Sequence, residues 1–207
     1  MSKRVIRLGI TGGIGSGKSF VSHALEERFG VPVYNCDQRA RHITVSDEGV
    51  IRELSTLIPN AYDADGKLNK RAVSDFLFSS DEHARMVNGI IHPAVRRDMH
   101  EWISSHGEEK IVAVESAILF ESGFAQDFDH VLFVDAPLDV RVKRVMKRDG
   151  VAEAEVERRI ARQQSDEDLR RADSVIVNDG HADVPSQLSS LLSHLSLWHE
   201  TINASEY

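Results

Sequence analysis

Short apolar runs, each bounded by glycine, proline or polar residues, recur along the chain. Five of these runs are rich in valine, isoleucine or leucine and predict strands: Val5–Ile10, Val31–Tyr34, Lys110–Glu115, Val131–Asp135 and Ser174–Val177. Most are continuously apolar and lack the strict alternation of a half-exposed sheet, which suits parallel strands that are covered on both faces. The pattern therefore predicts an α/β protein with a parallel five-stranded sheet.

Helical periodicity fills the segments between these runs. A first helix is expected from Gly17 to Phe29. Helical patterns dominate residues 37–105, interrupted by the turn Asp63–Gly66. A highly charged helical segment covers Leu138–Arg171, and an amphipathic helix that covers the sheet is expected at Val184–Trp198.

The layout predicts one domain over residues 1–207, with a core that two helical insertions interrupt. The core is expected at about 1–36, 106–138 and 172–207, and the insertions at about 37–105 and 139–171. The larger insertion contains His92, which precedes Pro93, and proline disfavours helical backbone in the residue before it. The backbone of His92 is therefore biased away from helix, and a structural role is the default for this lone histidine.

Composition narrows the possible partners and the compartment. A net charge of −8 argues against broad nucleic-acid binding, although a local basic pocket for phosphates is compatible with it. The single cysteine excludes an internal disulfide, and neither a signal peptide nor a membrane span is recognisable. We therefore expect a cytoplasmic protein with no nucleic-acid or membrane partner; the sequence does not define its oligomeric state.

A complete phosphate-binding motif, G-x-x-x-x-G-K-[ST], follows the first predicted strand and opens the first predicted helix. Its residues are Gly12, Gly13, Ile14, Gly15, Ser16, Gly17, Lys18 and Ser19. Glycines let backbone N–H groups surround an anion, the lysine reaches the β- and γ-phosphates, and the serine hydroxyl is a ligand for Mg²⁺. The sequence thus predicts a P-loop NTPase with a three-layer α/β/α core that binds a nucleotide together with Mg²⁺.

The motif alone does not identify the reaction, because GTPases, transport ATPases and small-molecule kinases share it. Asn69-Lys70-Arg71-Ala72 lacks the aspartate of a guanine-reading element, and no LSGGQ-like stretch of a transporter ATPase is present. A phosphotransferase is the remaining common class. Asp37, just past the second strand, lies where a carboxylate could orient an acceptor hydroxyl, but an N-cap at the start of a helix explains it equally well.

Arg141, Arg144 and Arg148 recur at spacings of three and four and therefore share one face of a helix. Converging arginines suit the oxygens of a transferred phosphoryl group. A solvated helix paired with nearby acidic residues is the ordinary alternative. The P-loop favours a mobile lid that brings these arginines to ATP.

Taken in order, these motifs resemble the dephospho-CoA kinase family over about residues 7–180. The stretches that carry the resemblance are GITGGIGSGKS, GVPVYNCDQ-x-AR, DGKLN, IIHP, ESAILFE, RVMKRD and ADSVIVNDG. The resemblance implies an ATP-dependent phosphorylation of the ribose 3′-hydroxyl of dephospho-CoA, the last step of coenzyme A biosynthesis. It also implies that the first insertion binds coenzyme A and that the second is a lid.

The resemblance assigns roles residue by residue. Asp37 is the implied catalytic carboxylate, with Lys18 and the lid residues Arg144 and Arg148 as further catalytic groups. The residues implied for the substrate are Asp37, Arg41, His92 and Glu121, and those implied for ATP beyond the P-loop are Arg148 and Asn178, with Gln163 as a further family position.

The chain departs from the family pattern beside this carboxylate and at the third strand. Asn35 stands where the family carries an aspartate, Cys36 replaces an alanine, and Glu115 replaces another aspartate. Cys36 is expected to be a small buried side chain. A nucleoside or nucleotide kinase of the same fold, and a nucleotide-gated regulatory NTPase without kinase activity, are the alternative functions.

Overall fold

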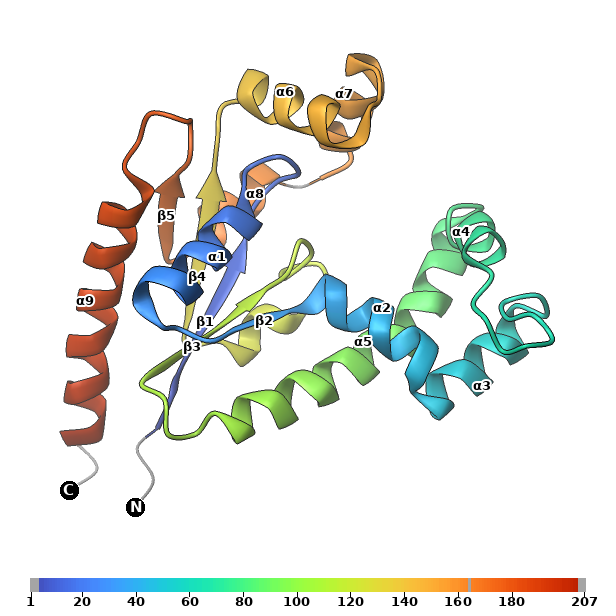
Figure 1. Cartoon of the computed structure of the whole chain (residues 1–207), viewed down its shortest axis with the longest axis horizontal. Coiled ribbons are helices and arrows are strands. Elements are labelled where there is room, and N and C mark those ends of the chain that lie inside the picture. Colours follow the sequence, from blue (N-terminus) through green and yellow to red (C-terminus); the bar gives the residue numbers. More distant parts are fainter. Residues whose placement is uncertain (1–3, 164, 205–207) are drawn as a thin grey trace. The chain divides into compact units, whose positions relative to one another are not determined.

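The computed structural model describes residues 4–163 and 165–204 (Figure 1). The chain forms two compact units, one within Met1–Tyr34 and Ile103–Tyr207 and the other within Asn35–Trp102. The first unit contains the sheet and the P-loop, and the second is built from helices.

The sheet of the first unit has five strands in the order β2-β3-β1-β4-β5. The strands are β1 Ile6–Thr11, β2 Val33–Asn35, β3 Ile111–Glu115, β4 His130–Asp135 and β5 Ser174–Val177. β1 pairs in parallel with β3 and β4, and β4 pairs in parallel with β5. The predicted parallel five-stranded sheet is confirmed, with strand ends within two residues of those expected from the sequence.

Helices of the first unit bury the apolar side chains of the central strands. These helices are α1 Lys18–Phe29, α6 Leu138–Asp149, α7 Glu153–Ala161, α8 Ser165–Arg171 and α9 Val184–Ala204, with a 3₁₀ turn, η1, at Phe124–Asp127. One core cluster joins α1 and α9 to the sheet through Leu8, Ile10, Leu25, Leu132 and Leu188, all fully buried. This burial of apolar surface is the main stabilising contribution to the unit and fixes the strand end from which the P-loop begins.

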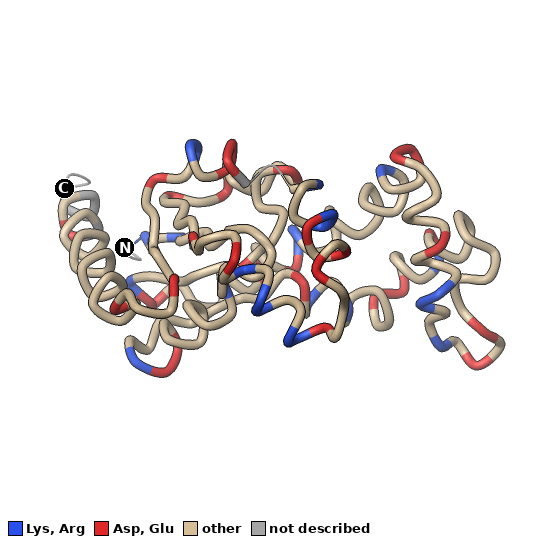
Figure 2. Tube along the Cα trace, turned by 90° about the horizontal axis from the view of Figure 1, so that it is seen from above, with Lys and Arg blue, Asp and Glu red and all other residues tan. Residues whose placement is uncertain are grey.

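The charged segment predicted at Leu138–Arg171 is three helices. α6 ends at Gly150, whose φ of 68° is a left-handed conformation that glycine adopts without steric cost. The covering helix expected at the C-terminus is present as α9 and runs beside β5 in Figure 1. Figure 2 shows acidic and basic residues interspersed along the chain.

The second unit contains α2 Cys36–Ser46, α3 Glu48–Leu57, α4 Lys70–Leu77 and most of α5 Asp81–Ser105. Leu54, Val87 and Met99 are buried within it. Ion pairs connect its helices: Arg39 to Asp98 at 2.5 Å and Arg97 to Asp47 at 3.3 Å. The predicted turn at residues 63–66 is present, with Gly66 at a φ of 77°.

The local bias of His92 away from helix does not decide its conformation, because α5 continues through His92 and Pro93. A proline removes one intrahelical hydrogen bond and restricts the preceding residue, at a cost of a few kcal/mol. The helix buries Val87, Ala94 and Met99 on either side of the proline, and this packing outweighs the local preference.

Two further properties concern the surface and the thiol. Among the described residues, none of the helices combines the length and the apolar composition that crossing a membrane would require. Cys36 is a buried side chain at the start of α2, as expected from the sequence.

Candidate nucleotide-binding site

The P-loop connects the end of β1 to the start of α1, as the motif predicts. A Cβ on Gly12 would lie 2.3 Å from the backbone oxygen of Val134, so a side chain cannot be placed there. Gly17 has a φ of 96° and is the N-cap of α1. The first N–H groups of α1 have no intrahelical acceptor, and the helix dipole is positive at this end. The loop is therefore shaped for an anion at the N-terminus of α1.

Lys18 is held across the mouth of the loop. Its Nζ donates a hydrogen bond to the backbone oxygen of Gly12 at 2.6 Å and a longer one to Gly13 at 3.4 Å. These bonds hold the ammonium group at the loop, so that its charge adds to that of the helix N-terminus.

Ser19 lies beside a buried carboxylate. Its Oγ donates a hydrogen bond to Oε1 of Glu115 at 2.9 Å, and Glu115 is the last residue of β3. Glu115 is buried. A hydroxyl and a carboxylate oxygen are the kind of ligands that Mg²⁺ accepts next to nucleotide phosphates, so this pair fits the ion. The sequence predicted Ser19 as a ligand. Glu115 was not predicted as one; its signals were its place at the end of an apolar strand and at a position where the family carries an aspartate.

Side chains of α6 contact the carbonyl groups of the P-loop. Arg141 Nε donates to the oxygen of Ile14 at 2.9 Å, and Arg144 Nη1 donates to the oxygen of Ser16 at 3.2 Å. Arg144 also donates to the oxygen of Asn178 at 2.9 Å. The predicted arginine face thus lies on the P-loop through Arg141 and Arg144.

Two amide side chains complete this network. Asn178 Nδ2 donates to the oxygen of Ser16 at 2.8 Å, and Asn178 itself is buried just past β5. Gln163 Oε1 accepts a hydrogen bond from the N–H of Ile14 at 2.7 Å. The C=O and the N–H of Ile14 are therefore both hydrogen-bonded to side chains of the segment predicted as a lid. Arg141, near the start of that segment, binds the C=O, and Gln163, near its end, binds the N–H.

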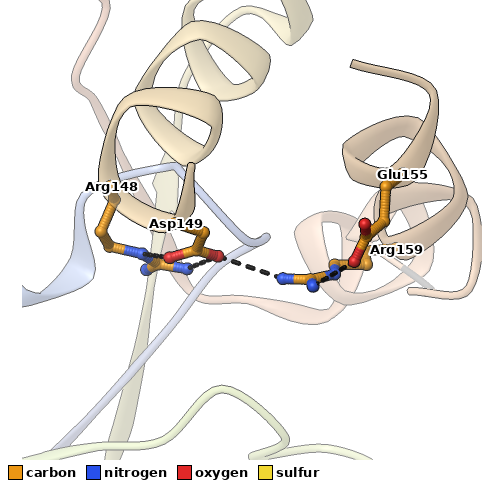
Figure 3. Close-up of polar contacts among 4 residues, drawn as sticks. All are labelled: Arg148, Asp149, Glu155 and Arg159. Atoms are coloured by element: carbon orange, nitrogen blue, oxygen red, sulfur yellow. Dashed lines mark hydrogen bonds and ion pairs between the residues drawn. The ribbon is translucent and has the colours of Figure 1, made fainter. Parts of the chain in front are cut away.

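Arg148 has different partners from Arg141 and Arg144. Its guanidinium donates two hydrogen bonds to the carboxylate of Asp149, at 2.7 and 3.1 Å (Figure 3). Arg159 joins the same carboxylate at 3.1 Å and also pairs with Glu155. The hydrogen bonds between Arg148 and Asp149 lower the pKa of the Asp149 carboxyl and raise the pKa of the Arg148 guanidinium, and the opposite charges act in the same direction. This exposed group connects α6 to α7.

Glu121 is exposed in the turn that follows β3, near a buried acid. Asp168 of α8 is 6% exposed, and burial together with the charge of Glu121 raises its pKa to about 6. The Cζ atom of Arg171 lies 4.3 Å from the centre of the Phe120 ring. The positive charge of Arg171 opposes the rise in the pKa of Asp168. The predicted substrate residue Glu121 is thus electrostatically coupled to α8.

In the second unit, Asp37 and Arg41 are exposed residues of α2. Asp37 is not the N-cap of α2: Asn35 is, and its side chain accepts a hydrogen bond from the N–H of Gln38 at 2.9 Å. Asparagine and aspartate are equally good N-caps, which gives Asn35 a structural role that needs no charge. His92 is half-buried in α5, and this burial lowers its pKa.

The strand–loop–helix cradle and the parallel sheet define a nucleotide-binding protein with the P-loop kinase fold. A family model described as dephospho-CoA kinase matches residues 6–183. The chain belongs to the dephospho-CoA kinase family.

Similar proteins agree with this assignment. A protein from Bacteroides fragilis strain YCH46, named dephospho-CoA kinase, is 45% identical over 192 residues, covering 92% of this chain and 93% of the relative. The crystal structure of TT1252 from Thermus thermophilus superposes with a TM-score of 0.81 at 37% identity, covering 93% of this chain and 99% of that one. A dephospho-CoA kinase from Campylobacter jejuni has the same fold, with a TM-score of 0.67 at 22% identity over 92% and 96% of the two chains.

Proposed function

We propose that this chain transfers the γ-phosphate of ATP to the ribose 3′-hydroxyl of dephospho-CoA and releases coenzyme A and ADP. The observation that carries the proposal is a complete P-loop, with Lys18 at its mouth and Ser19 beside Glu115, in a chain that matches the dephospho-CoA kinase family over most of its length.

The P-loop residues and α6 account for phosphate binding in this proposal. Backbone N–H groups of the loop and of α1 bind the β- and γ-phosphates, and Lys18 neutralises part of their charge. Ser19 and Glu115 would hold a Mg²⁺ ion, which would supply positive charge to the phosphates. Arg144 and Arg148 stabilise the negative charge on the transferred group, and Arg148 must leave Asp149 to do so. Asn178 contributes to ATP binding from its position beside Ser16.

Asp37 is the proposed catalytic carboxylate. It accepts a hydrogen bond from the acceptor hydroxyl and orients that oxygen for in-line attack. Because phosphoryl transfer passes through a loose transition state, we assign Asp37 an orienting role ahead of strong general-base catalysis. Arg41, His92 and Glu121 are the proposed contacts of dephospho-CoA, with residues 37–105 as the acceptor-binding insertion and 139–171 as the lid.

An acceptor screen tests the reaction. ADP release would be measured with ATP and Mg²⁺ against dephospho-CoA, nucleosides and nucleoside monophosphates, with coenzyme A identified by mass spectrometry. Rapid ADP release with dephospho-CoA alone is the expected result. Turnover with nucleosides or nucleotides would identify the nucleotide-kinase alternative, and ATP hydrolysis that ignores every acceptor would identify a regulatory NTPase.

Replacing Asp37 by asparagine tests the assignment of the carboxylate. We expect Asp37→Asn to reduce kcat by about 100-fold or more, because orientation and proton acceptance are worth roughly that factor. The dissociation constant for ATP should stay within twofold of the wild-type value, since the proposed partner of Asp37 is the acceptor hydroxyl and not ATP.

The matched control is Asp75→Asn, which removes the same charge from an exposed position of α4 in the same unit. This variant should retain wild-type kinetics. Wild-type turnover by Asp37→Asn, or an equal loss in both variants, would exclude Asp37 as the catalytic carboxylate.

A further inference from the structure

Arg141, in the first turn of α6, is packed directly on the P-loop. Its Nη2 and Cζ atoms lie 2.3 and 2.6 Å from the position that a Cβ on Gly13 would occupy, so the guanidinium covers this glycine. Its backbone oxygen lies 2.6 Å from the corresponding position on Gly15. Its Nε donates to the oxygen of Ile14 at 2.9 Å. Arg141 thus contacts three consecutive residues of the loop.

This arrangement is unfavourable for a residue whose role is packing alone. Arg141 is only 9% exposed, and its Nη2 is a buried donor that has no hydrogen-bond partner among the residues that the structure describes. Burial disfavours the charged guanidinium and lowers its pKa, although the charges of Asp135 and Asp166 oppose this shift. A buried donor without a partner is destabilising, whereas an apolar side chain of similar length would fill the same space without that cost.

The position of the unpaired donor decides how Arg141 can act. Nη2 has almost no accessible surface and faces Gly13, so a phosphate cannot reach it without displacing the side chain. The influence of Arg141 on a bound nucleotide must therefore pass through the loop. Its bond to the Ile14 carbonyl, together with that of Gln163 to the Ile14 N–H, fixes both peptide groups of that residue. A loop fixed before binding loses less conformational entropy when it takes up a phosphate.

We propose that Arg141 is a positioning residue of the nucleotide site, which holds the Gly13–Ile14–Gly15 turn in its phosphate-binding conformation and thereby sets the affinity for ATP. The inference deepens the proposed function, because it assumes that the P-loop binds a nucleoside triphosphate, but it does not depend on the identity of the acceptor. The sequence grouped Arg141 with Arg144 and Arg148 as arginines that a lid would bring to ATP; the inference gives Arg141 a role that acts through the loop instead.

The first test replaces Arg141 by methionine, which has a similar length but no hydrogen-bond donor and no charge. Binding of a non-hydrolysable ATP analogue with Mg²⁺ would be measured by isothermal titration calorimetry, and Tm by circular dichroism. We expect binding to weaken about tenfold, as the loss of one hydrogen bond from a charged donor implies. The Tm should be unchanged or higher, because the buried unpaired donor is removed.

Lys143→Met provides the matched control. Lys143 lies on the same helix, is exposed and pairs only at the surface with Asp139 at 3.1 Å, so its replacement makes the same change in side-chain type and charge without touching the loop. The control should bind the analogue within twofold of wild type. Wild-type affinity in Arg141→Met, or equal weakening in both variants, would overturn the proposal.

A double-mutant cycle tests the contact with Gly13 itself. Gly13 lacks the positive φ that would strain an alanine, so the consequence of Gly13→Ala depends on the guanidinium that occupies the Cβ position. Gly13→Ala alone should weaken analogue binding at least tenfold. Adding Gly13→Ala to Arg141→Ala should cause less than a twofold further loss, because the space is then empty. If Gly13→Ala weakened analogue binding by the same factor in the wild type and in Arg141→Ala, the proposed contact would be contradicted.

These measurements separate this inference from the proposed function. Analogue binding requires no acceptor, so a protein that fails to phosphorylate dephospho-CoA can still confirm or overturn the role of Arg141. In an active enzyme, Arg141→Met should raise KM for ATP about tenfold and leave KM for dephospho-CoA within twofold. A rise in both constants would indicate a general structural defect and count against a positioning role.

Discussion

The N-cap of α2 offers a sharp test of how local structure supports the proposed chemistry. Asn35 has extended backbone angles, with φ of −100° and ψ of 106°, and its side chain accepts the N–H of Gln38 at 2.9 Å. Asn35→Ala removes this bond and should cost about 1 kcal/mol. For a chain of this size, such a loss corresponds to a decrease in Tm of about 2–4 °C.

Asn35→Asp should behave differently, although it alters the same position. Aspartate caps a helix as well as asparagine does, and a negative charge at a helix N-terminus contributes about 0.3–1 kcal/mol of further stability. Coulomb repulsion from the carboxylate of Asp37, two positions along the chain, offsets part of that gain. The Tm of Asn35→Asp should therefore be equal to that of the wild type or slightly higher.

The kinetic effect follows from the position of Asp37 in the first turn of α2. Loss of the cap allows this turn to fray, so Asn35→Ala should reduce kcat several-fold, whereas KM for ATP stays constant. Asn69→Ala is the control, because Asn69 caps α4 through the N–H of Ala72 at 3.1 Å and no proposed catalytic residue lies in that helix. It should lower stability without lowering kcat.

Thermal unfolding by calorimetry and steady-state kinetics with dephospho-CoA would measure both effects. A Tm of Asn35→Ala within 1 °C of wild type would refute the capping argument. A fall in kcat for Asn69→Ala as large as that for Asn35→Ala would refute the connection between the α2 cap and Asp37. A fall in Tm for Asn35→Asp would show that position 35 requires an uncharged side chain.

Two further predictions concern buried acids. Glu115→Gln keeps an acceptor for the Ser19 hydroxyl but removes a negative charge. The Mg²⁺ concentration for half-maximal activity, measured by metal titration, should therefore rise about tenfold. An unchanged dependence of activity on Mg²⁺ would exclude Glu115 from the metal site. Asp168 has a folded pKa of about 6, above its ordinary value of 3.8, so the folded state binds more protons than the unfolded state between those values and loses stability as the pH rises through this window. Asp168→Asn should therefore raise Tm by a few degrees at pH 8 and have little effect at pH 4, and a lower Tm at pH 8 would show that the ionised carboxylate is stabilising.

Features governed by neighbouring residues were predictable from the sequence. The five strands, the first helix, the P-loop and the turn at residues 63–66 all appear where the patterns place them. Each depends on short-range preferences: apolar runs between breakers, glycines at left-handed positions, and a helix start after a phosphate-binding turn. The exception is the helix through His92 and Pro93, where burial of apolar residues on both sides of the proline outweighed the local bias.

Contacts between distant residues required the tertiary structure. Ser19 and Glu115 are 96 positions apart, and Arg141 and Ile14 are 127 apart. No spacing rule predicts such pairs, because strand order and helix packing determine which side chains meet. The sequence likewise placed Arg141, Arg144 and Arg148 on one face, but only the packing of α6 separated the two that contact the P-loop from Arg148, which pairs with Asp149.

The sequence by itself determined that this chain builds a parallel sheet with a phosphate-binding loop, and its motifs identified the dephospho-CoA kinase family. These features could be recognised because each strand and each motif is a contiguous stretch of residues. The tertiary structure decided what surrounds the cradle: a carboxylate beside Ser19, an arginine packed on Gly13, and a cap at Asn35 that leaves Asp37 exposed. The physical reason is that hydrogen bonding and burial depend on which elements pack together, and that choice is made by the whole core.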